Sequence, residues 1–140
     1  MKYENPNRLL VVEDNAEVRA LAIRIGTLSG YQCAGCASLS EFHREFSSLS
    51  PTVILLDLVL GDEDALPVID FLASVQYRNP VLLMSAHDHR LLQSVQLSGR
   101  DRGLHIAGII EKRMGMERLE HALNSYIIGT RGTVAKEKKN

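Results

Sequence analysis

The 140-residue sequence has few cysteines and no long apolar run, and these absences exclude several classes of protein. Two cysteines are too few for a fold that is held together by disulfides. Because no run reaches about 18 apolar residues, we expect no membrane span and no membrane partner. The polar N-terminus also lacks the hydrophobic core of a signal peptide, so we expect a cytoplasmic protein.

The sequence has no excess of either charge. Sixteen Lys and Arg residues stand against 17 Asp and Glu residues, which gives a net charge of −1. This balance provides no general attraction to nucleic acid, and we expect no direct nucleic-acid partner. Hydrophobic residues make up 45% of the chain, which is enough for the core of one ordinary domain.

The chain also lacks a glycine-rich phosphate loop, although short apolar runs are present that could precede one. The turn after the first run reads EDNAE, which is not a glycine fingerprint. An enzyme that binds a nucleotide through such a loop is therefore the least favoured function for this sequence.

The two cysteines form a C-x-x-C motif at Cys33 and Cys36. Redox pairs of this kind begin a helix, where the thiolate gains from the helix dipole. Here both lie in or near a predicted strand, in which residues three apart point to opposite faces. Zinc would need two further ligands at matched spacing, so the sequence favours ordinary packing for both thiols.

Short apolar runs alternate with helical patterns along the chain. Runs that predict strands covered on both faces are Leu9–Val12, Thr52–Leu56, Val81–Met84 and Ile106–Ile110, with Tyr31–Ala37 as a weaker fifth. Helical patterns cover Ala16–Leu28, Leu39–Phe46, Leu66–Val75, Arg90–Leu97 and Met116–Ile128. The alternation predicts an α/β fold, a flavodoxin-like (βα)5 domain whose five-stranded parallel sheet has the order 2-1-3-4-5, with helices on both faces.

In such a fold, ligands bind at the carboxyl ends of the strands. The residues that end the first, third, fourth and fifth predicted strands there include Glu13, Asp14, Asp57, Ser85 and Lys112. Three converging carboxylates repel one another unless a divalent cation lies among them, and Mg²⁺ prefers such oxygen ligands. With a lysine and a hydroxyl added, these are the parts of a phosphoryl-transfer site.

Each of these residues has a simpler explanation when it is taken alone. Asp14 could cap the first helix, with Glu17 as its capping-box partner. Asp57 could open a turn after its strand, and Ser85 and Lys112 are ordinary strand-end residues. The argument for a site depends on their joint occurrence at one edge of the predicted sheet.

Four segments resemble the response-regulator receiver family in the expected order: LLVVEDN, DLVLGDEDA from Asp57, LLMSAHD and GIIEKRM. Asp64 matches the second aspartate of the segment that follows the third strand. The resemblance covers residues 8–128 and implies a receiver domain there. Residues 1–7 would then be an N-terminal extension, and residues 129–140 a basic C-terminal tail or linker.

The resemblance implies that Asp57 accepts a phosphoryl group from a sensor histidine kinase or a phosphotransfer protein. The chain would then be a signalling domain of a two-component phosphorelay and not an enzyme. The resemblance further implies that Ser85 and the backbone N–H of Ala86 bond the phosphoryl group, and that Lys112 stabilises its charge. The implied Mg²⁺ ligands are Glu13, Asp14, Asp57 and the backbone carbonyl of Val59.

The sequence departs from the family pattern at several positions. Gly61 and Ala65 stand where Pro and Gly are usual, and Arg113 replaces the Pro that commonly follows the lysine. Ile109 occupies the place of a switch aromatic, which indicates an altered relay to the output face. These departures keep open a second interpretation, a non-phosphorylated pseudo-receiver that acts as a protein-interaction module.

The segment from Ser85 to Lys112 is longer than is typical of the family. In this respect, and in its GLHIAGIIEK stretch, the chain is similar to receivers attached to EAL-type cyclic-di-GMP phosphodiesterase domains. An EAL-type output domain and a homodimer through the region of the fourth helix and fifth strand are the output arrangements that this resemblance implies.

Overall fold

The computed structural model describes residues 5–86, 89–112 and 116–128. Their main feature is a five-stranded parallel sheet in the order β2-β1-β3-β6-β7. These five strands are, in chain order, β1 (Arg8–Val12), β2 (Gln32–Cys36), β3 (Val53–Asp57), β6 (Pro80–Ser85) and β7 (His105–Glu111). The predicted order 2-1-3-4-5 is therefore confirmed for the five long strands.

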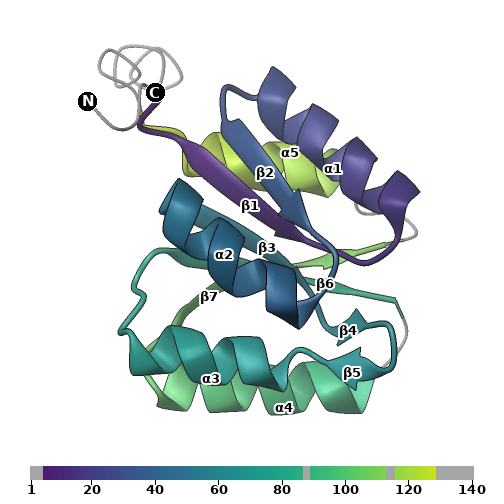
Figure 1. Cartoon of the computed structure of the whole chain (residues 1–140), viewed down its shortest axis with the longest axis vertical. Coiled ribbons are helices and arrows are strands. Elements are labelled where there is room, and N and C mark those ends of the chain that lie inside the picture. Colours follow the sequence, from purple (N-terminus) through teal and green to yellow (C-terminus); the bar gives the residue numbers. More distant parts are fainter. Residues whose placement is uncertain (1–4, 87–88, 113–115, 129–140) are drawn as a thin grey trace.

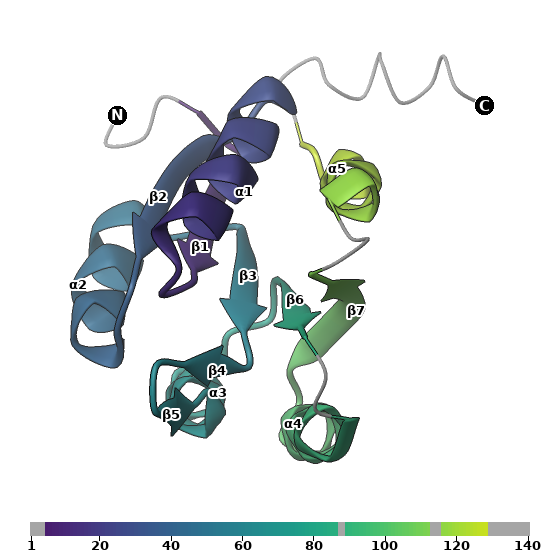
Figure 2. The same ribbon diagram turned by 90° about the vertical axis from the view of Figure 1, so that its right-hand side faces the viewer.

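Helices cover both faces of the sheet, as Figure 2 shows. They are α1 (Ala16–Leu28), α2 (Leu39–Leu49), α3 (Leu66–Ser74), α4 (His89–Asp101) and α5 (Met116–Ser125). One apolar cluster joins α2, α3 and α4 to one face, and a second joins α1 and α5 to the other. No helix among the described residues is long and apolar enough to cross a membrane.

Alternation along the strands divides the core between the two faces. Leu9 and Val11 of β1 pack toward α1 and α5, whereas Leu10 and Val12 pack toward the opposite helices. All four side chains are fully buried, as expected for a central strand of a parallel sheet. Cys33 and Cys36 likewise pack on opposite faces, Cys33 against the α1 side and Cys36 against the α2 side.

Three helices end three or four residues away from the predicted position. The helix α2 continues to Leu49, which is buried, and ends where Ser50 takes a left-handed conformation with φ of 49°. The helix α4 continues to Asp101, because Val95 and Gly99 keep a buried stripe through the polar stretch. The helix α5 ends early, at Ser125.

A small antiparallel hairpin, β4 (Val59–Leu60) and β5 (Glu63–Asp64), follows β3 and was not predicted. Strands of two residues leave no periodic pattern in a sequence. In Figure 1 the arrowheads of β1 and β2 point to the side on which this hairpin lies. The hairpin therefore stands at the carboxyl edge of the sheet, where the candidate site residues are.

Two features lie away from that edge. The pairing of β6 with β7 skips Ala107, because Val81 pairs with Ile106 and Leu82 pairs with Gly108, which makes a β-bulge in the edge strand. At the opposite end of the sheet, the buried Asn7 side chain bonds both backbone groups of Ile128. The predicted tail, residues 129–140, and Arg113 lie outside the described residues.

Candidate functional site

The carboxyl ends of β1, β3 and β7 bring the predicted site residues together. Val12 pairs with Leu56 in neighbouring strands, so Glu13 and Asp57 follow at the same level of the sheet. Each of Glu13, Asp14 and Asp57 offers one carboxylate oxygen, and these three oxygens lie within 4.8 Å of one another. Glu13 and Asp57 are buried, whereas Asp14 is exposed. The sequence therefore located the acidic cluster correctly.

Lys112 supplies a positive charge to this cluster. Its Nζ lies 2.9 Å from Asp57 Oδ2 and 3.0 Å from Glu13 Oε1. Burial acts to lower the pKa of Lys112, but the close contacts with Asp57 and Glu13 and the charges of these two carboxylates outweigh burial, so the pKa is raised. Lys112 is thus held in its charged form between the two buried carboxylates.

The cost of burying the Glu13 carboxylate is only partly offset by its hydrogen-bond and ion-pair partners. Burial raises its pKa to about 7, although the Asn15 N–H bonded to its Oε2 at 3.0 Å and the ammonium group of Lys112 both act to lower it. The Lys112 Nζ lies 3.0 Å from Oε1, yet no described residue donates a well-directed hydrogen bond to this buried oxygen. The short distance establishes the ion pair, and Oε1 retains unused capacity as a ligand.

This donor set fits a hard divalent cation. Mg²⁺ is bound in proteins by a few carboxylates together with waters. Here two buried carboxylates and one exposed carboxylate converge, and the one lysine contacts only the two buried ones. The incompletely bonded oxygen of Glu13 is the observation that favours a further cation, since buried polar atoms are otherwise nearly always satisfied.

The β3–α3 segment turns around Asp57. The Val59 N–H donates to Asp57 Oδ1 at 3.3 Å, which places the start of the hairpin against the carboxylate. The ligand role of the Val59 backbone carbonyl stays a prediction. Asp64, the second aspartate of the motif, accepts from the Leu66 N–H at 2.9 Å and so supports the start of α3.

Ser85 and Ala86 follow at the end of β6, next to the lysine strand. The Ser85 carbonyl accepts from the Lys112 N–H at 3.0 Å, and the Ser85 side chain is buried. Met84 pairs with Asp57, so Ser85 stands one residue beyond the level of the carboxylate. Ala86 is exposed. The phosphoryl-binding roles of both residues stay predictions.

Two supporting residues were missed from the sequence. The Arg19 guanidinium donates through Nη1 to the backbone carbonyls of Glu13 at 2.8 Å and of Asp14 at 3.4 Å. The Gly61 N–H donates to Asp14 Oδ2 at 2.9 Å. Of these two residues, only Gly61 was noticeable in the sequence, because it stands where the family usually has proline. The cap of α1 is Asn15 and not Asp14, so the simpler explanation of Asp14 as a helix cap is wrong.

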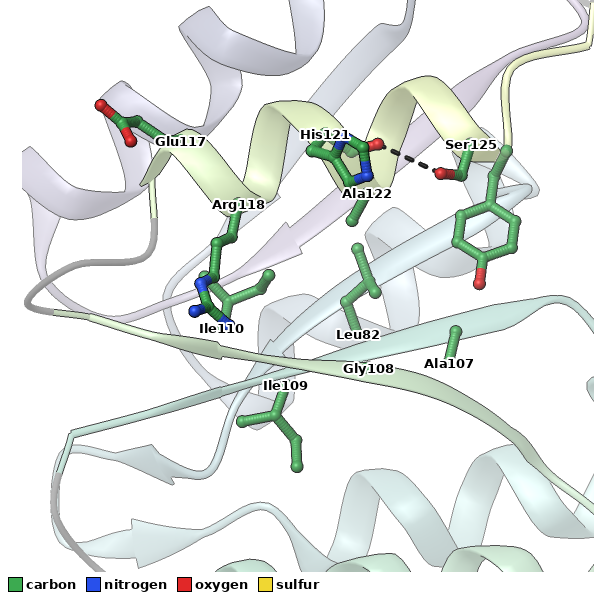
Figure 3. Close-up of a pocket in the computed structure, with 11 residues that line it drawn as sticks. Leu82, Ala107, Gly108, Ile109, Ile110, Glu117, Arg118, His121, Ala122 and Ser125 are labelled. Carbon is green, nitrogen blue, oxygen red and sulfur yellow. Dashed lines mark hydrogen bonds between the residues drawn. The ribbon is translucent and has the colours of Figure 1, made fainter. Parts of the chain in front are cut away.

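A separate groove of about 500 Å³ lies between β7 and α5. Its apolar floor includes Leu82 and Gly108, and its α5 wall carries Arg118, His121 and Ser125 (Figure 3). None of the acidic cluster lines this groove. Ile109, at the position of the usual switch aromatic, packs against the apolar core cluster that joins α2, α3 and α4 to the sheet.

Comparisons with known proteins agree on one family. The profile of the response regulator receiver domain matches residues 9–124. The regulatory protein VirG of Agrobacterium tumefaciens is 31% identical over 85 residues, which cover 61% of this chain and 32% of VirG. The regulatory protein AtoC of Escherichia coli is 30% identical over 83 residues, which cover 58% of this chain and 18% of AtoC. The matches thus span a third or less of these relatives.

Solved structures show the same fold. A response regulator from Colwellia psychrerythraea superposes with a TM-score of 0.71 at 26% identity, covering 85% of this chain and 94% of that one. A CheY-like response regulator receiver domain protein from Methanospirillum hungatei has a TM-score of 0.71 at 14% identity, covering 96% of this chain and 98% of that one. The latter likeness supports the fold alone.

Proposed function

Because the chain belongs to the response regulator receiver domain family of two-component systems, we propose that Asp57 accepts a phosphoryl group from a histidine kinase or phosphotransfer protein. One observation carries the proposal: Asp57 is a buried carboxylate within reach of two further carboxylates and in direct contact with a lysine. No other described aspartate is buried.

The transfer step follows from this arrangement. A carboxylate oxygen of Asp57 attacks the phosphorus of a phosphohistidine on the partner, so an O–P bond forms and the P–N bond breaks. The electron pair of the broken bond stays on the imidazole nitrogen of the partner. Asp57 then carries up to about two negative charges, and Lys112, 2.9 Å from its Oδ2, offsets part of that charge.

We propose that Glu13, Asp14, Asp57 and the backbone carbonyl of Val59 hold Mg²⁺, which supplies positive charge for the oxygens of the phosphoryl group. The Ser85 hydroxyl and the Ala86 N–H then bond the phosphoryl group at the end of β6. Since Ser85 is joined to Lys112 through its backbone, a shift there reaches β7 directly.

The output surface is the region of α4 and β7 in this proposal. Ile109 packs there as an aliphatic side chain and has no ring to move between two pockets, so the relay differs from the usual aromatic switch. Residues 8–128 form the receiver unit. An EAL-type output domain and a homodimer through α4 and β7 stay predictions from the sequence resemblance.

Labelling by acetyl phosphate with Mg²⁺ tests the proposal. Wild-type protein should become labelled, and Asp57→Asn should abolish the label because the amide is not a phosphoryl acceptor. Asp101→Asn, which changes an exposed aspartate at the end of α4, is the matched control and should be labelled like the wild type. Undiminished labelling of Asp57→Asn would contradict the assignment, and an unlabelled wild type would favour the pseudo-receiver.

A further inference from the structure

Gly61 has a conformation that few other residues adopt. It is the first of the two residues between β4 and β5, flanked by the paired Leu60 and Glu63, and its φ is +63°. The first turn residue of a two-residue hairpin usually has a positive φ, and glycine adopts this angle without steric cost. Proline, the usual family residue here, is restricted to a φ near −65° and could not adopt this turn.

The same residue makes a contact between distant parts of the chain. Its N–H donates to Asp14 Oδ2 at 2.9 Å, across 47 positions in the sequence. Among the described residues, Gly61 is the one hydrogen-bond donor to the Asp14 carboxylate. Proline has no N–H, so this bond exists only because the family proline is absent.

Asp14 differs from its two neighbours in the way it is held. Glu13 and Asp57 are buried and fixed by Lys112, whereas Asp14 is exposed. An exposed aspartate can adopt several rotamers, and repulsion from the two buried carboxylates would turn it away from them. The Gly61 N–H opposes both effects, because it fixes one oxygen of Asp14 and partly offsets its charge.

We propose that Gly61 is a positioning residue for the cation site: its N–H holds the Asp14 carboxylate toward Asp57 and so strengthens divalent-cation binding. The inference rests on the proposed function, since it deepens the role of that acidic cluster. Hydrogen-bond partners of ligating carboxylates orient the ligands, and their loss typically lowers metal affinity by about 10- to 100-fold. The β4–β5 hairpin thereby becomes part of the site's support.

Isothermal titration of the full chain with MgCl₂ tests this inference. Gly61→Pro removes the donor and excludes the observed φ, so we expect affinity for Mg²⁺ to fall by about 10- to 100-fold. Gly61→Asn is the matched control, because asparagine keeps the N–H and tolerates a left-handed conformation. Its affinity should stay close to that of the wild type. Equal affinities of Gly61→Pro and wild type would overturn the inference.

Amide hydrogen exchange provides a second measurement that does not depend on the folding of Gly61→Pro. Without Mg²⁺, the Gly61 amide of the wild type should be protected, and Asp14→Ala should remove that protection. Equal exchange rates in the two proteins would contradict the bond on which the inference depends. If the wild type bound no Mg²⁺, the proposed cation site itself would fail, whereas normal binding by both wild type and Gly61→Pro would refute only the role of Gly61.

Discussion

Replacing Lys112 with Met removes the positive charge that lies between two buried carboxylates. The lost contacts are the pairs with Asp57 at 2.9 Å and with Glu13 at 3.0 Å. At an effective dielectric constant of about 20, each pair contributes roughly 6 kcal/mol before desolvation. Removing one partner of a buried pair usually costs about 3–5 kcal/mol. Because the Lys112 side chain is 24% exposed, we expect a loss of about 2–4 kcal/mol in the free energy of unfolding.

The pH dependence of this loss follows from Glu13. Burial raises its pKa from 4.5 to about 7, so the folded state disfavours the charged carboxylate. This group therefore costs no stability below about pH 4.5, and its cost grows as the pH rises toward 7. Lys112 acts to lower that pKa, so its loss should raise it further. The difference between Lys112→Met and wild type should be larger at pH 8 than at pH 5.

Urea denaturation at both pH values, in EDTA and in excess Mg²⁺, measures these differences. Mg²⁺ should restore part of the lost stability, because a bound cation replaces the missing charge. Arg24→Met, which removes an exposed cation from α1, is the control and should change the free energy of unfolding little at either pH. A Lys112→Met protein as stable as the wild type at pH 8 in EDTA would refute the electrostatic reasoning.

Two further predictions concern the core. Burial raises the pKa of Cys33 and raises that of Cys36 to about 12, so both thiols should react slowly with Ellman's reagent at pH 8 in the folded protein and rapidly in urea; a folded protein that reacts at the rate of a free thiol would contradict this. The Phe42 ring is fully buried and lies edge-on to the Phe71 ring, with 5.7 Å between the two ring centroids. Phe42→Ala should therefore lower the free energy of unfolding by about 3–5 kcal/mol, and a loss below about 1 kcal/mol in chemical denaturation would show that the cavity collapses.

The sequence predicted the sheet well, because four of its strands are buried apolar runs. Right-handed crossovers leave few strand orders, and the common one for five βα units is the order observed. It predicted helix ends less well. The helical pattern of α5 continues through Tyr126 to Ile128, yet the helix ends at Ser125, and Ile127 packs from the following segment against the apolar cluster on the α1 and α5 side. Such tertiary contacts leave no periodic signal.

The acidic cluster could be predicted for a similar reason, since the carboxyl ends of parallel strands meet at one edge. The contacts that hold the cluster in place could not be predicted from the sequence. Arg19 bonds backbone carbonyls and Gly61 donates through its own backbone, and neither contact depends on a side-chain pattern that a sequence shows. The departure from proline at Gly61 was visible, but its meaning required the turn conformation.

The bulge at Ala107 has a consequence for the behaviour of the protein in concentrated solution. The strand β7 has seven residues and forms one edge of the sheet, and long, flat edge strands are templates on which strands of other molecules can pair. An unpaired residue bends the strand and increases its twist. Ala107 is left without a partner between the pairs Val81–Ile106 and Leu82–Gly108. We therefore expect this edge to be a poor surface for intermolecular sheet extension, which opposes aggregation.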